Sequence, residues 1–123
     1  MFEILALLLA PQSITLDDLT VKEGDAPQVI VSKVIKGYDL CLFSNARRYA
    51  LSTSETAPVI VDSTFGSCSS WDSTYRNSIV LFIPSLPPSQ VDDQIDRYKL
   101  TRRPQLLAYV LDVRIKKRAG RKR

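Results

Sequence analysis

Large apolar residues recur at every second position near the C-terminal end of the chain. Within residues 105–116 the odd positions are Leu107, Tyr109, Leu111, Val113 and Ile115. The even positions are apolar as far as Val110 and then become polar, at Asp112, Arg114 and Lys116. Successive side chains leave a β-strand on opposite faces, so this period of two predicts a strand with one face buried along its whole length.

Apolar runs of strand length recur through the rest of the chain. Two of them, residues 29–35 and 38–43, are divided by Lys36 and Gly37, and glycine supplies the positive φ that a tight hairpin needs. One long strand with a bulge at Gly37 is the alternative interpretation. The further strands predicted are residues 47–52, 58–65 and 75–83.

The segments between these runs carry turn, loop and helix signals. Glu23-Gly24-Asp25 predicts a turn, and the small polar residues 66–74 predict a surface loop. Residues 90–100 have apolar positions at helical spacing and predict one short helix, capped by Ser89 and broken by residues 101–104.

Together these elements predict a mainly β fold. Several short strands separated by closely spaced turns are typical of a small antiparallel sandwich or a partly open barrel, here with one short helix near residues 90–100. A chain of 123 residues with an apolar fraction of 45% most simply forms one domain. We therefore expect a single β-rich domain over residues 1–115 and a flexible basic tail over residues 116–123.

The net charge of +4 conceals a strong asymmetry along the chain. Residues 114–123 hold seven basic side chains and no acidic one, whereas residues 1–113 hold ten Lys and Arg against thirteen Asp and Glu. A tail of +7 on a body of −3 indicates an interaction tail that binds phosphates of a nucleic acid. The residues predicted to make these contacts are Arg114, Lys116, Lys117, Arg118, Arg121, Lys122 and Arg123.

A second basic surface is predicted where cations and aromatic rings alternate. Nucleic-acid surfaces combine cations for phosphates with rings for base stacking, although solvated strand edges show the same alternation. The residues of this surface are Arg47, Arg48, Tyr49, Tyr75 and Arg76.

The sequence contains no recognisable catalytic or metal-binding set. It has no histidine, which excludes histidine-based nucleophile activation, and two cysteines are too few for a closed zinc site. Asp92, Asp93 and Asp96 resemble a magnesium-binding cluster, but an acidic first turn that complements the helix dipole explains them better. We therefore expect no enzyme, no cofactor and no metal.

The predicted function is that of a non-enzymatic β-domain whose tail contacts DNA or RNA, or acts as a nuclear-import signal. Small viral accessory and structural proteins share this composition, which is an analogy and identifies no family. The alternative is a protein–protein interaction or self-assembly module that uses free sheet edges, in which the tail only keeps the protein soluble.

Cysteine use and the N-terminus bear on the compartment. Cys41 and Cys68 are too few for a disulfide framework, so free thiols in a reducing compartment are expected, with a single bridge as the alternative. Residues 1–10 are apolar but too short to span a membrane, and a secretory signal is their minority interpretation because Glu3 replaces the usual basic residue. We expect an intracellular protein, with the nucleus as a candidate, and no membrane span.

Overall fold

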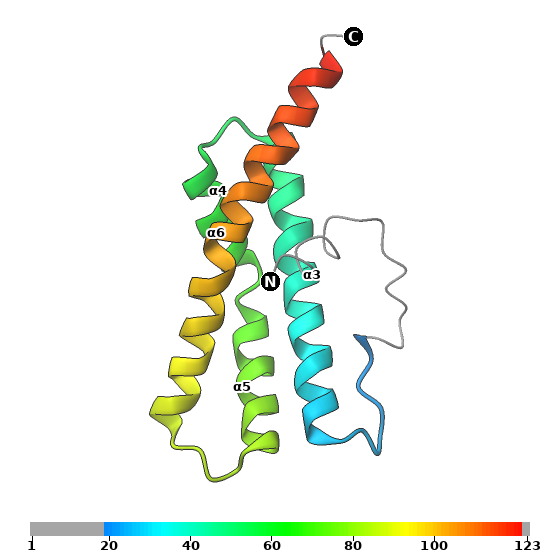
Figure 1. The fold of residues 1–123 in the computed structure, drawn as a ribbon, viewed down its shortest axis with the longest axis vertical. Helices are drawn as coiled ribbons and strands as arrows, with labels where there is room; N and C mark the ends of the chain where they lie inside the picture. The colour runs from blue at the N-terminus through cyan, green and yellow to red at the C-terminus, as the bar shows by residue number, and fades with distance from the viewer. Residues whose placement is uncertain (1–18, 122–123) are drawn as a thin grey trace.

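The chain folds as a bundle of α-helices in the computed structural model, which describes residues 19–121 (Figure 1). The helices are α3 (Pro27–Ser52), α4 (Ala57–Ser67), α5 (Ser70–Phe82) and α6 (Pro88–Arg121). Helices α3 and α6 run in the same direction, and α4 and α5 follow one another in the opposite direction (Figure 1). No strand occurs within residues 19–121, so the predicted sandwich or barrel is wrong.

Helix α6 contains the segment that was predicted as the last strand. Its buried residues there are Leu106, Val110 and Val113, whose spacing of four and three places them on one face of a helix. Leu111 and Ile115, which contributed to the alternation, are 51% and 59% exposed. The period of two arose because this helix carries apolar residues on its outer face as well as on its buried face.

The short helix predicted at residues 90–100 is the first part of α6, which has 34 residues. A proline fits the first turn of a helix, where its missing amide proton is not needed, and α6 begins at Pro88. Ser89 therefore lies inside the helix and does not cap it. The segment 116–121, which was predicted to be a flexible tail, continues the helix.

Helix α6 also passes through the break that was predicted at residues 101–104. Pro104 cannot donate a backbone hydrogen bond, but the preceding turn is held from two sides. Arg102 pairs with Asp39 of α3, and Arg103 pairs with Asp62 of α4, each at 2.7 Å. Ion pairs from the turn before the proline to two other helices thus help to keep the helix continuous.

Helix α3 replaces the predicted hairpin and the predicted strand at residues 47–52. Gly37 lies within this helix, and the ring of Trp71 on α5 packs so closely against it that a Cβ atom at position 37 would overlap the ring. Glycine is therefore required for the close approach of α3 and α5, and neither the turn nor the bulge predicted at this position is present.

Helices α4 and α5 occupy the segments that were predicted as two further strands and a loop. Residues 58–65 lie in α4 and most of 75–83 lies in α5. The segment 66–74, predicted as a loop, comprises the end of α4, the two junction residues Cys68 and Ser69, and the start of α5. The β-branched Ile60, Val61 and Thr64 are buried on one face of α4. β-branched residues have only a slightly lower helix propensity, and burial of such a face outweighs it.

A disulfide bond joins Cys41 in the middle of α3 to Cys68 at the C-terminal end of α4. Cys68 is fully buried, at 0% exposure, and the side-chain nitrogen of Asn45 lies 3.5 Å from both sulfur atoms. The expectation of free thiols is therefore wrong. The bond fixes the junction of α4 and α5 to α3.

The turn predicted at Glu23-Gly24-Asp25 precedes α3 and is confirmed. Gly24 has a φ of +90°, and the backbone N–H of Asp25 donates to the carbonyl of Lys22 at 3.1 Å. The backbone N–H of Lys22 and the ammonium group of Lys33 donate to the Asp25 carboxylate, and they lower its pKa. The apolar residues 1–10, for which a secretory signal was considered, lie outside the described residues.

Candidate functional site

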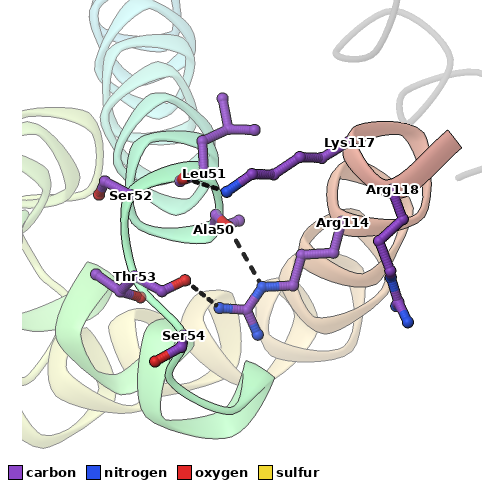
Figure 2. A pocket seen from close by; sticks show the side chains of 8 residues that line it. All are labelled: Ala50, Leu51, Ser52, Thr53, Ser54, Arg114, Lys117 and Arg118. Carbon is purple, nitrogen blue, oxygen red and sulfur yellow. Dashed lines mark hydrogen bonds between the residues drawn. The ribbon is translucent and has the colours of Figure 1, made fainter. Parts of the chain in front are cut away.

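The candidate site is a cleft of about 500 Å³ where the end of α3 meets the last third of α6 (Figure 2). Its lining residues are Ala50, Leu51, Ser52, Thr53, Ser54, Arg114, Lys117 and Arg118. One wall is the final turn of α3 and the residues after it, and the other is a row of three cations on α6. We call Arg114, Lys117 and Arg118 the basic triplet. No carboxylate is among the residues that line the cleft.

Two members of the basic triplet donate hydrogen bonds to the backbone at the end of α3. The last carbonyl groups of a helix have no partner within it, and α3 has no basic residue in its own last turn. Arg114 donates to the carbonyls of Ala50 at 3.3 Å and Thr53 at 2.9 Å, and Lys117 donates to the carbonyl of Leu51 at 2.6 Å. Helix α6 thus supplies the cations that the negative end of the α3 dipole favours.

The third member, Arg118, is exposed and its side chain extends away from the α3 carbonyls (Figure 2). It makes no hydrogen bond or ion pair within residues 19–121. Positions 114, 117 and 118 are three and four residues apart, so their side chains share one face of α6.

Most of the hydrogen-bond donors of the triplet are unused. A guanidinium has five N–H donors and an ammonium has three, and the contacts to α3 use two from Arg114 and one from Lys117. The cleft therefore combines a concentrated positive charge with free donors. This arrangement can donate hydrogen bonds to the oxygen atoms of an anion.

The other cations that were predicted to bind nucleic acid lie outside this cleft. Lys116 pairs with Asp112 at 3.0 Å, and their side chains are 76% and 44% exposed, so this pair contributes little to stability. Arg121 ends helix α6, and Lys122 and Arg123 lie outside the described residues. The structure thus brings together Arg114, Lys117 and Arg118 and directs Lys116 to a different partner.

The predicted function depended on a β-domain with a flexible tail or with free sheet edges. Both forms of that prediction are wrong, because residues 19–121 contain no strand and the basic segment is helical as far as Arg121. Sequence reasoning found the cations but missed the wall that faces them. The exposed carbonyls of α3 could have been predicted only by recognising residues 47–52 as the end of a helix.

The second basic surface that was predicted is distributed over two helices. Arg47, Arg48 and Tyr49 lie on α3, where Arg48 sits over the Tyr49 ring and the Tyr49 hydroxyl shares a 2.5 Å hydrogen bond with Ser67. This hydrogen bond, together with the nearby Arg48, lowers the pKa of Tyr49. On α5, Tyr75 is buried against Tyr98, and Arg76 pairs with Asp92 at 2.5 Å.

A buried polar cluster between α3, α5 and α6 was not predicted. Asp39, which is 5% exposed, accepts hydrogen bonds from the Tyr98 hydroxyl at 2.5 Å and from Arg102 at 2.7 and 3.1 Å. Beside it, Asp72 of α5 accepts from the Tyr38 hydroxyl at 2.5 Å and from Lys99 at 2.7 Å. Each carboxylate therefore binds one phenol and one cation.

The electrostatics of this cluster favour a structural role. Burial, reinforced by the charge and hydrogen bond of Asp39, raises the pKa of Tyr98, and burial together with Asp72 raises the pKa of Tyr38. Burial alone would lower the pKa of Arg102, but the hydrogen bonds and charge of Asp39 raise it. The phenols therefore remain donors and the guanidinium remains charged, and the cluster joins three helices. The only sequence signal was the pair of polar residues Tyr98 and Arg102, four positions apart.

Three comparisons with known proteins give no relative from which a function can be transferred. No family model, curated protein or solved structure matches the chain. None of the helices within residues 19–121 is both long and apolar enough to span a membrane. The same part of the chain gathers no group of three His, Cys, Asp or Glu side chains that could hold a metal ion.

Proposed function

We propose that this protein is a helical anion-binding module that takes a phosphate group into the cleft between α3 and α6. The observation that carries the proposal is the basic triplet, Arg114, Lys117 and Arg118, on one wall of a cleft lined by no carboxylate. Phosphate is the natural anion for such a site because a guanidinium fork matches two of its oxygens and an ammonium adds a point charge.

The charge balance of the cleft supports a ligand. The end of α3 contributes the equivalent of about half a negative charge, which cannot neutralise three cations. Like charges within a few ångströms repel one another, so an anion that enters the cleft relieves this repulsion as well as accepting hydrogen bonds. A purely structural cap for α3 would need only Arg114 and Lys117, which make all of the hydrogen bonds from the basic triplet to its carbonyls.

Inorganic phosphate and a nucleic-acid backbone present the same chemistry to this cleft. The test is a titration of the ¹⁵N-labelled full chain, followed by NMR, with inorganic phosphate and separately with a short DNA duplex. We expect saturable shifts of the backbone amides of Leu51–Ser54 and of Lys117 and Arg118. If only the duplex binds, the phosphate that the cleft takes belongs to a nucleic acid.

The variant Arg118→Gln separates binding from capping, because Arg118 donates no hydrogen bond to the carbonyls of α3. One charged hydrogen bond contributes about 1.5 kcal/mol, so we expect phosphate to bind roughly tenfold more weakly while the free energy of unfolding stays unchanged. The matched control is Arg97→Gln, which removes the same charge about 30 Å away along α6. An equal loss of phosphate affinity in both variants, or the absence of saturable chemical-shift changes in the original chain, would contradict the proposal.

A further inference from the structure

Three consecutive residues with hydroxyl side chains, Ser52, Thr53 and Ser54, belong to the wall of the cleft opposite the basic triplet (Figure 2). Two of these hydroxyls are engaged with α3. The Ser52 hydroxyl donates to the carbonyl of Arg48 at 2.7 Å, and the Thr53 hydroxyl donates to that of Tyr49 at 2.9 Å. The Ser54 hydroxyl makes no hydrogen bond within residues 19–121, so of the three it alone has no partner there.

Ser54 is also accessible to an enzyme. It is exposed and lies in the segment 53–56 between α3 and α4, which is not helical. A protein kinase must bring a substrate hydroxyl to its catalytic base and to the γ-phosphate of ATP together, which favours exposed segments outside helices. Ser52, in contrast, is held in the last turn of α3.

The hydrogen bond from Arg114 to α3 places Ser54 beside the basic triplet. The Arg114 guanidinium donates to the Thr53 carbonyl at 2.9 Å, and the carbon of that carbonyl is bonded directly to the backbone nitrogen of Ser54. The Cα atom of Ser54 is therefore one peptide unit from the group that Arg114 binds. Rotation about the exposed Cα–Cβ bond of Ser54 can turn a phosphate toward Arg114 and Arg118.

We propose that Ser54 is a phosphorylation site whose phosphate occupies the cleft in place of a separate anion. The inference rests on the proposed function, since it takes the basic triplet as a phosphate-binding set. In the reaction, the Ser54 oxygen attacks the γ-phosphorus of ATP, the bond to the bridging oxygen breaks to release ADP, and the hydroxyl proton passes to the aspartate base of a protein kinase. The product carries a charge of about −1.5 to −2 and three acceptor oxygens, which match the unused donors of the triplet.

The charges around Ser54 favour its phosphorylated form. The basic triplet supplies three cations, and α4 begins at Ala57, so the positive end of its dipole follows Ser54 closely. The opposing charges are the exposed Glu55 and the negative end of α3, whose carbonyls already accept from Arg114 and Lys117. Three cations exceed one carboxylate and a partial charge, so the attraction for a phosphate prevails.

The first test compares full chains that carry phosphoserine at Ser54 or at Ser63, introduced during translation. Ser63 is the matched control because it is exposed and adjacent to one carboxylate, Asp62, but lies in α4 and does not line the cleft. A ³¹P NMR titration measures the second pKa of each phosphate, which is ordinarily about 6. Cations stabilise the dianion, so we expect a pKa about one unit lower at Ser54 than at Ser63.

Variants of the Ser54-phosphorylated chain show whether the triplet causes this difference. Arg118→Gln should raise the pKa of the phosphate toward the value at Ser63, whereas Arg97→Gln should leave it unchanged. Equal pKa values at Ser54 and Ser63, or equal effects of the two arginine variants, would overturn the proposal.

The second test is competition with inorganic phosphate, followed by NMR. The unmodified chain and the chain phosphorylated at Ser63 should bind it alike, and the chain phosphorylated at Ser54 should bind it roughly tenfold more weakly, because its own phosphate holds the donors. Unchanged binding after modification of Ser54 would overturn the inference. If the unmodified chain binds no phosphate, the proposed function fails, and the ³¹P comparison still decides the inference.

The ability of Ser54 to accept phosphate is tested with a panel of purified serine/threonine kinases and ATP. Mass spectrometry of the full chain should locate the added phosphate on Ser54 in preference to Ser52 and Thr53, and the variant Ser54→Ala should lose it. A panel in which no kinase modifies Ser54 would overturn its assignment as a modification site.

Discussion

At the scale of single residues, the alignment of the bundle depends on Asp39 and Arg102. Their side chains are 7% and 12% exposed, and their charges meet at 2.7 Å with the Tyr98 hydroxyl on the same carboxylate oxygen. A buried ion pair contributes little net stability compared with an apolar replacement, but the loss of one partner leaves the other charge buried without compensation. The pair therefore penalises any packing of α6 against α3 that separates the two charges.

The neighbouring arginines Arg102 and Arg103 provide a matched comparison. Removing the cation from the buried pair, in Arg102→Met, should lower the free energy of unfolding by about 3–5 kcal/mol because Asp39 stays buried. Arg103→Met removes an ion pair of the same length whose side chains are 39% and 66% exposed, and should cost less than about 1 kcal/mol. Urea unfolding measures both, and similar values for the two variants would contradict the role assigned to Asp39.

The phenol of Tyr98 makes stability depend on alkaline pH. Burial and the Asp39 carboxylate raise its pKa above the value of about 10 for an unfolded tyrosine, so folding favours the neutral form. This contribution is complete below about pH 10 and is lost as the pH rises further. The free energy of unfolding should therefore fall above about pH 10, and less steeply in Tyr98→Phe. Equal slopes in the two proteins would exclude Tyr98 as the cause.

At the scale of elements, the apolar patterns wrongly predicted strands wherever a helix has apolar residues on more than one side. In α3 the correct signal was present, because Val34, Tyr38, Leu42, Ala46 and Ala50 recur every four residues and are all buried. It was obscured by Val29, Ile30, Val31 and Ile35, which extend the run into a strand-like block. The helix start near residue 90 and the turn at Gly24 were predictable, since local residue types determine them.

The candidate site was predictable only in part, because local residue types determine its cations but not the surface that faces them. The concentration of cations after Arg114 is a property of the sequence, and three of those cations line the cleft. Their partner surface, the carbonyls of Ala50, Leu51 and Thr53, is set by tertiary packing between segments more than 60 residues apart. No local pattern records such a contact, so neither the cleft nor the capping of α3 by α6 could be derived.

The disulfide between α3 and α4 should add stability without determining the fold. It closes a loop with a sequence separation of 27, for which restriction of the unfolded chain predicts about 3–4 kcal/mol. Reduction, or the variant Cys41→Ala, Cys68→Ala, should lower the free energy of unfolding by about that amount while the helical circular dichroism stays the same. Loss of the helical signal on reduction would show that the bond is required for folding.

At the scale of the whole molecule, α6 takes part in the core, in the buried polar cluster and in the cleft. Its buried face completes the core, its arginines reach the buried carboxylate and the end of α3, and its outer face carries exposed apolar residues. The last turns of this helix extend past the other helices (Figure 1). The proposed cleft requires that residues 105–116 are helical and packed against α3.

The backbone conformation of residues 105–116 is the most direct test of this account. It can be read from the ¹³Cα and ¹³Cβ chemical shifts of the full chain in solution. Continuous helical shifts from Pro88 through Lys117, with slow amide exchange at Leu106, Val110 and Val113, are the predicted result. Extended shifts for Leu107 to Ile115 would contradict it, since they would restore the strand and remove the face that presents the basic triplet to α3.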